Sequence, residues 1–152
     1  MALNTAGIAS GIAGLSVSGV TFKNITALPR TVTKGDCPVF FPDPGEWYAG
    51  TQSSVDTFGT DGMWTAERRF RYIYLHDVST ASKTISTLMA AMAAKTDAIH
   101  EAIVEMDVSG VDVTSVSVSR FGEIEAPPIA GQNRSVFFGC FFEIGIRERI
   151  NA

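Results

Sequence analysis

The sequence has few cysteines and no basic stripe. Two cysteines, Cys37 and Cys140, in 152 residues are too few for a disulfide-rich secreted scaffold, so we expect reduced thiols in an intracellular compartment. The 12 Lys and Arg residues are scattered except for Arg68, Arg69 and Arg71, and 16 Asp and Glu residues outnumber them. Proteins that read nucleic acids concentrate positive charge on one face, so specific nucleic-acid binding is not expected.

The chain also lacks a long, uninterrupted apolar run. Residues 2–22 precede the first charged residue, Lys23, but they have no basic start and are diluted by polar residues and four glycines. A secretory signal needs a basic start, and a membrane-spanning helix needs about 20 mostly apolar residues. We therefore expect no signal peptide and no contact with a membrane, only a weak helix with Ile8, Ile12 and Leu15 facing a core.

No catalytic or metal-binding motif is present. The histidines His76 and His100 have no HxxxH or HExxH spacing, and no P-loop, GxGxxG or GxSxG sequence follows a predicted strand. Cys140 lies in an apolar row, where burial raises the pKa of a thiol, so we interpret it as core filler. Glu101 and Glu105 lie one helical turn apart, which is typical of a solvated helix face. We expect no enzymatic activity, no metal and no cofactor.

The most informative segment is the strand predicted over residues 136–147. Its even positions form an apolar row from Val136 to Ile146, which the period-two pleat places on one face. The odd positions include Phe137 and Phe141, so the other face is not simply solvated. A chain of 152 residues is expected not to cover both faces alone. Neighbouring subunits are therefore predicted to complete the sheet.

Residues 64–76 predict a second strand of the same kind, apolar on both sides from Phe70 to Leu75. Apolar residues at steps of three and four between Ile85 and Met106 predict a long amphipathic helix after it. A further strand is expected over residues 113–125. Val111 and Val113 are out of phase with Val116 and Val118, which indicates either a bulge or a later start of the strand.

Residues 43–62 are predicted to form a long exposed excursion, because they are rich in Gly, Ser, Thr and Asp. Trp47, Tyr48 and Phe58 within it favour an interface arm, since disordered segments are poor in aromatic residues. A small hairpin that packs its aromatic residues on the body is an equally weighted alternative.

Together these elements predict a single domain over residues 1–152 of the α+β class. We expect a mostly antiparallel four-stranded sheet with two helices on one face and the long loop or hairpin excursion.

The order of these elements resembles the tail terminator, or tail completion, proteins of long-tailed bacteriophages. The resemblance covers nearly the whole chain. It is carried by the N-terminal helix, the Pro38–Pro42 strand with its long excursion, the aromatic and basic strand Phe70–Tyr74, the alanine-rich helix and the final pair of strands ending in Phe138–Ile144. It implies a hexameric ring of identical subunits at the head-proximal end of the tail in the virion, assembled in the host cytoplasm. It also implies contacts with the tail tube protein and with a head-tail connector or neck protein.

Site residues follow from the two-faced strands, the excursion and the acidic balance. The expected subunit-interface residues are Phe70, Tyr72, Tyr74, Phe137 and Phe141. The expected interface residues of the excursion are Trp47, Tyr48 and Phe58. DNA is expected to pass through the ring without specific binding, along a lumen whose candidate residues are Glu67, Asp112, Glu123, Glu125 and Glu143.

Two alternatives remain open. Another phage neck, head-closure or minor tail ring protein would have a similar pattern. A small cytosolic ligand-binding domain or enzyme subunit is less favoured, because it would need a polar cluster on one sheet face, and the sequence indicates none.

Overall fold

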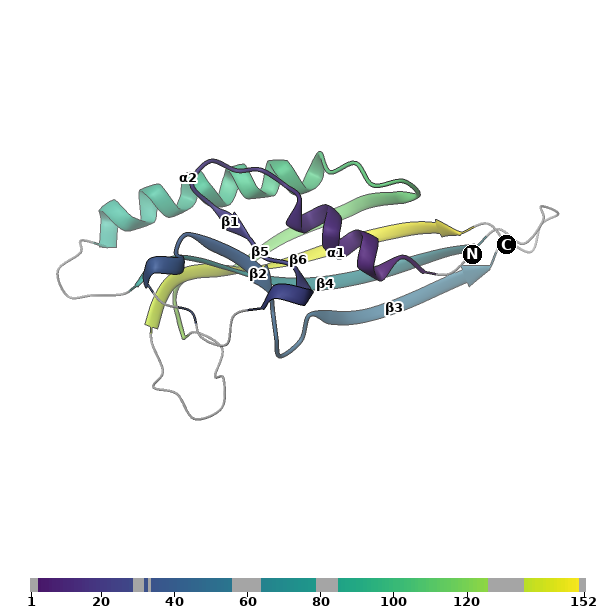
Figure 1. Ribbon diagram of the computed structural model, residues 1–152, viewed down its shortest axis with the longest axis horizontal. Helices are drawn as coiled ribbons and strands as arrows, with labels where there is room; N and C mark the ends of the chain where they lie inside the picture. Colours follow the sequence, from purple (N-terminus) through teal and green to yellow (C-terminus); the bar gives the residue numbers. More distant parts are fainter. Residues whose placement is uncertain are drawn as a thin grey trace.

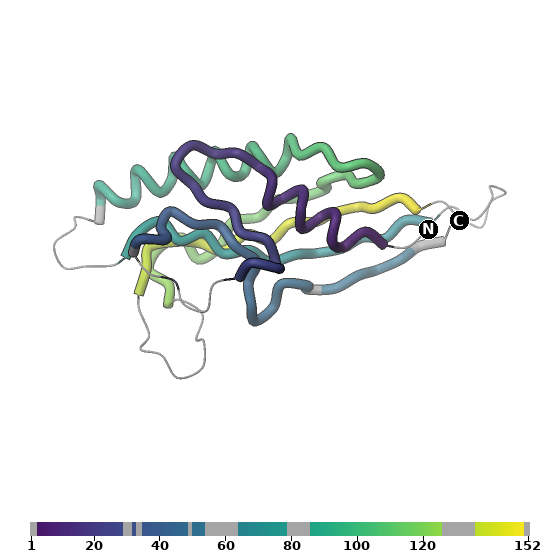
Figure 2. The backbone as a smooth tube through the Cα atoms, viewed as in Figure 1, coloured from purple at the N-terminus to yellow at the C-terminus, as the bar shows by residue number. Residues whose placement is uncertain are grey.

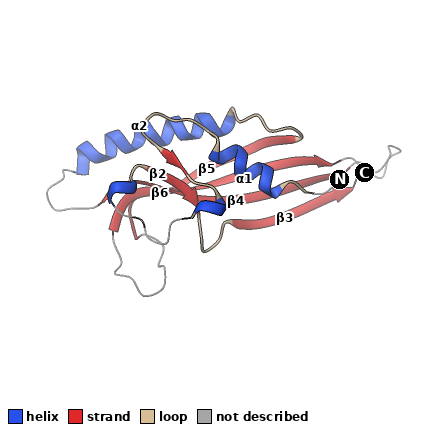
Figure 3. Cartoon of the chain, in the orientation of Figure 1, coloured by secondary structure: helices blue, strands red, loops and turns tan. Residues whose placement is uncertain are grey.

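A computed structural model describes residues 3–28, 32, 34–55, 64–78, 85–125 and 136–150. A long sheet runs along the molecule, with both α-helices on the same side of it (Figures 1 and 3). The elements in chain order are α1 (Thr5–Ala13), β1 (Thr21–Phe22), the 3-10 helices η1 (Ile25–Ala27) and η2 (Lys34–Asp36), β2 (Val39–Pro42), β3 (Tyr48–Val55), β4 (Trp64–Val78), α2 (Ile85–Val104), β5 (Val111–Glu125) and β6 (Val136–Ile150).

The sheet has six strands in the order β1-β2-β4-β6-β5, with β3 also paired to β4. β1 and β2 are parallel, and every other neighbouring pair is antiparallel. β3 pairs with the first half of β4, from Trp64 to Phe70, and β2 with its second half, from Tyr72 to Leu75. Both strands thus lie along the same side of β4.

The expectation of a mostly antiparallel four-stranded sheet is therefore wrong, because the sheet has six strands and is mixed. β1 has only two residues, too few to show any periodicity. β3 lies within the segment expected to be an excursion, because the sequence around Thr51, Gln52 and Ser53 is polar. A strand without apolar and polar residues in alternation lacks the pattern by which strands are recognised.

The main core lies between the helices and the sheet. α1 contributes Ile8 and Ile12, and α2 contributes residues at the predicted helical spacing. The even-numbered row of β6 packs beneath them from Phe138 to Ile146, as predicted, whereas Val136 at the start of the strand is exposed. Figure 2 shows the segment after α1 turning back beside α2 before it enters β1, and there the Lys95 ammonium donates a hydrogen bond to the Ser18 carbonyl.

A second, smaller apolar cluster lies on the other face of the sheet. Its buried members are Val39, Phe41, Ile73, Leu75, Ile124 and Phe137. Val32 and Cys37, from the segment before β2, pack against it. The chain therefore covers one end of its second face by itself, because a segment distant in sequence from β6 lies against it.

Candidate functional site: the open face of the sheet

Three predicted interface aromatics, Phe70, Tyr72 and Tyr74, belong to the main core. They are 0%, 1% and 0% exposed. Tyr72 stacks on Phe40 of β2, with ring centroids 5.0 Å apart. These side chains alternate onto the helix-covered face of β4, so the chain's own helices cover them and they offer no surface to a neighbour.

The other two, Phe137 and Phe141, lie on the opposite face. Phe137 is buried in the smaller cluster. Phe141 is only partly buried, and the guanidinium carbons of Arg71 and Arg120 lie 5.5 and 5.4 Å from its ring centroid. Cations within about 6 Å of an aromatic ring are attracted to it. Among the five predicted aromatics, Phe141 is therefore the one that retains accessible surface.

The described part of the excursion, residues 43–55, contains a turn and then β3, which pairs antiparallel with the first half of β4 instead of forming a separate small hairpin. The Asp43 carboxylate accepts a hydrogen bond from the Gly45 N–H at 2.9 Å, which closes the turn before β3. The rings of Trp47 and Tyr48 then lie 5.0 and 5.4 Å from that of Phe70 on β4. Trp47 is partly buried, whereas Tyr48 remains exposed. Phe58 lies outside the described residues.

We call the sheet surface opposite the helices the open face. Along most of β3, β4, β6 and β5 it carries charged and small polar side chains. Glu67 pairs with Arg147 at 3.0 Å, Asp112 with Arg149 at 2.5 Å, and Glu143 with Arg69 at 3.7 Å. Three of the five predicted lumen carboxylates thus share this face and are each matched by an arginine on a neighbouring strand.

The remaining two predicted lumen residues, Glu123 and Glu125, are exposed near the end of β5. A register shift between Ser119 and Gly122 separates them from the polar part of the open face. Glu123 pairs with Phe138 of β6, whose side chain lies on the helix-covered face, so Glu123 is placed on that face as well. The structure therefore brings Glu67, Asp112 and Glu143 together but not the other two.

The open face is hollowed. A hollow of about 490 Å³ extends across four strands and is lined by Gln52 of β3, Glu67 and Arg69 of β4, Glu143 of β6 and Ser115 of β5. Residues of four neighbouring strands thus surround one hollow on this face. Of the paired charges, Glu67, Arg69 and Glu143 line it.

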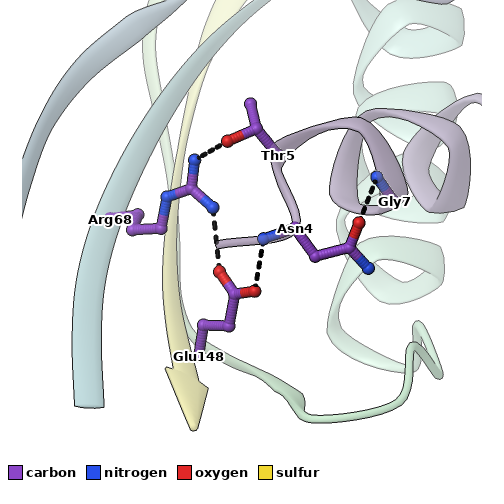
Figure 4. A network of polar contacts seen from close by, with 5 residues as sticks. All are labelled: Asn4, Thr5, Gly7, Arg68 and Glu148. Atoms are coloured by element: carbon purple, nitrogen blue, oxygen red, sulfur yellow. Dashed lines mark hydrogen bonds and ion pairs between the residues drawn. The ribbon is translucent and has the colours of Figure 1, made fainter. Parts of the chain in front are cut away.

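A buried ion pair on the helix-covered face was not predicted. Arg68 donates to the Glu148 carboxylate at 2.9 Å, and the Asn4 N–H donates to the other carboxylate oxygen at 2.6 Å (Figure 4). The Thr5 hydroxyl accepts from a second Arg68 nitrogen. The rings of Tyr48 and Phe70 lie beside the guanidinium. This network attaches the start of α1 to β4 and β6.

The sequence indicates this ion pair through the positions of its two charged residues within their strands. Arg68 lies between Ala66 and Phe70 on the core face of β4, and Glu148 lies between Ile146 and Ile150 on the core face of β6. Two opposite charges in apolar rows indicate a buried pair, because an isolated charge is too costly to bury.

Potentially reactive groups are buried rather than gathered in a site. Cys140 lies in the core as predicted, where burial raises the pKa of its thiol to about 11. Burial also raises the pKa of the Tyr74 phenol, which lies 2.7 Å from His76 Nδ1. Among the described residues, no three metal-binding side chains cluster together.

Comparisons with known protein families and with curated proteins return no match for this chain. Within the described part of the chain, no helix has the length and apolarity needed to cross a membrane.

Proposed function

We propose that this chain forms a hexameric ring that caps the head-proximal end of a phage tail tube, stops tube polymerisation and provides the surface to which the head joins. The order of elements that carries the family resemblance is present: an N-terminal helix, the short β2, the long β4, the alanine-rich α2 and the final antiparallel pair β5 and β6. The extra strands β1 and β3 extend the same sheet without changing this order.

The observation that carries the proposal is the open face with its paired charges and its hollow. In the proposed ring this face is turned towards the axis and the helices lie outside. Arg69, Arg147 and Arg149 each have a carboxylate within 4.0 Å. A DNA phosphate must compete with those carboxylates for each of these three arginines, so little affinity is gained from counterion release there. A duplex can then slide through the ring without being retained.

This charge arrangement modifies the expected lumen. The acidic balance alone predicted a surface that repels phosphates, whereas the open face alternates both signs. Of the predicted lumen residues, we retain Glu67, Asp112 and Glu143 in the proposal.

The two ends of the molecule differ, as a terminating ring requires. In Figure 1 the end of β3, the start of β4 and the end of β6 lie towards one end of the long axis, whereas η2 and the start of α2 lie towards the other. If the strands run roughly along the ring axis, the two rims carry different elements. One rim can then bind the tube protein while the other accepts a connector or neck protein, and no further tube subunit adds.

The test is deletion of the gene from the phage that encodes it, with electron microscopy of the tails and complementation from a plasmid as the control. We expect tails of irregular, excessive length that fail to join filled heads, and restored length on complementation. Tails of normal length that lack fibres or a baseplate would place the protein at the wrong end of the virion. Normal tails beside heads that lose their DNA would instead indicate a head-closure ring.

A further inference from the structure

The sheet has two long lateral edges without a strand partner among the described residues. β5 pairs with β6 along one side only, apart from a bridge between Val108 and Val111 at its start. β3 pairs with β4 along one side only. The outer sides of both strands therefore present backbone donors and acceptors in the plane of the sheet.

The middle of β5 lacks the usual protection of an edge strand. Residues 115–119 include no charged residue and no proline, both of which prevent edges from pairing. Register shifts at Val113/Ser115 and Ser119/Gly122 enclose a regular run, residues 115–119. In that run, serines alternate with Val116 and Val118, and Val118 is 38% exposed although it is apolar. This run is suited to pairing with another strand.

The exposed residues of β3 have matching chemistry. Thr51, Gln52 and Ser53 are uncharged, as are the serines of the β5 run. Thr and Ser side chains opposite one another stabilise antiparallel strands through hydrogen bonds, and no like charges would meet between these two segments. The two edges are therefore chemically compatible with each other.

The directions of the edge strands determine whether two copies of the chain can pair in an antiparallel arrangement. β3, β4, β6 and β5 alternate in direction, because each neighbouring pair is antiparallel. β3 and β5 therefore run in opposite directions. When a second copy is generated by rotation about an axis parallel to the strands, its β3 lies antiparallel to β5 of the first copy, which is the more stable arrangement.

We propose that β5 of one copy pairs with β3 of the next, so that the sheet continues from subunit to subunit. This pairing rests on the ring proposed above and names the surface that closes it. The contact is heterologous, since each copy offers one edge to each neighbour, and such contacts generate rings when the rotation closes.

Site-specific cross-linking tests the pairing. Ser117 of β5 and Gln52 of β3 both lie at open-face positions, opposite Glu143 and Glu67 respectively. Ser117→Cys and Gln52→Cys are made separately and together in a Cys37→Ser background, and the assembled protein is treated with a short bismaleimide. We expect dimers when the two single variants are mixed, none from either alone, and a ladder up to the hexamer from the double variant.

The other outcomes separate this pairing from the ring itself. Dimers from Ser117→Cys alone would mean that two β5 edges pair symmetrically and would overturn the proposal. Absence of cross-links, while native mass spectrometry shows a hexamer, would overturn the edge pairing and leave the ring standing. A wild-type protein that is monomeric both in solution and on isolated tails would overturn both.

A charge placed on the edge provides a second test. Ser117→Lys should raise the protein concentration needed for assembly by about tenfold or more, because an edge lysine must be desolvated for a strand to pair beside it. Ala91→Lys on the exposed side of α2 is the matched control and should assemble as the wild type does. Circular dichroism melts verify that both variants are folded. Unchanged assembly of Ser117→Lys would contradict the proposal.

Discussion

The helix-covered face and the open face of β4 and β6 carry the same kinds of residue under different conditions. Both faces include an arginine paired with a glutamate. The side chains of Arg68 and Glu148 are 0% and 5% exposed, whereas those of Arg147 and Glu67 are 48% and 59% exposed. Both faces also carry phenylalanines from β6. The comparison teaches that the covering of a face, rather than the residue type, determines what a substitution there costs.

The largest expected difference separates Phe138 from Phe141. Phe138→Asp places an unpaired carboxylate in the main core and should leave the domain unfolded, at a cost above about 4 kcal/mol. Phe141→Asp should cost about 1 kcal/mol or less, because the ring is partly exposed and the new carboxylate lies near Arg71 and Arg120. Thermal melts by circular dichroism measure both. The reverse order would shift the assignment of faces by one residue.

The two ion pairs provide the next contrast. Glu148→Gln leaves the buried Arg68 charge without its carboxylate and should lower the free energy of unfolding by about 3–5 kcal/mol. Glu67→Gln, the matched change on the open face, should lower it by about 0–1 kcal/mol. Urea denaturation distinguishes these values. Equal effects would mean that solvent reaches Arg68 in the folded protein.

Two glycines of β6 allow a finer comparison. An added Cβ at Gly139 would collide with the backbone carbonyl of Tyr74, whereas one at Gly145 would meet the Ser115 hydroxyl. Gly139→Ala should cost about 2 kcal/mol, since the backbone has to shift. Gly145→Ala should cost less, and Ser115→Gly should recover part of that loss. Recovery of Gly139→Ala by Ser115→Gly would contradict the assigned contacts.

The smallest effect at neutral pH concerns the thiols. Because the pKa of Cys140 is raised to about 11 from 9.0, its thiol remains protonated at pH 8, and a maleimide should label half-buried Cys37 before Cys140. A raised pKa also means that the folded state holds this proton more tightly than the unfolded state does. The contribution to stability is therefore complete below pH 9 and is lost between pH 9 and 11. Cys140→Ala should reduce that loss in alkaline urea titrations.

Sequence periodicity predicted the elements in which one face is buried. The apolar row of β6 and the helical spacing of α2 both reflect a single covered side, and both lie where expected. The face assignment of Phe70, Tyr72 and Tyr74 also followed from alternation. Alternation did not predict which face of β4 the helices would cover. The second half of β4 is apolar on both sides, so only the packing of distant segments determines the covered face.

The remaining features depend on contacts between distant segments. The sequence of β3 shows no alternation of apolar residues, and its pairing with β4 is supported by the turn at Asp43 and by the packing of Trp47 on Phe70. Phe137 is buried partly because Val32 and Cys37 lie against its cluster. No local pattern contains such information. The Arg68–Glu148 pair could be predicted from the alternation of each strand, because both charged residues stand at positions that face the core.

That pair also dictates an order of events during synthesis. Arg68 leaves the ribosome 80 residues before Glu148, and Asn4 leaves it 144 residues before. Until β6 emerges, a nascent chain holds the guanidinium of β4 without its carboxylate and the start of α1 without its anchor. The helix-covered core consequently closes late, after the strand that carries Glu148 has been translated. The buried ion pair and the central strand that supplies its glutamate are therefore completed together, because β6 also pairs with β4 and β5.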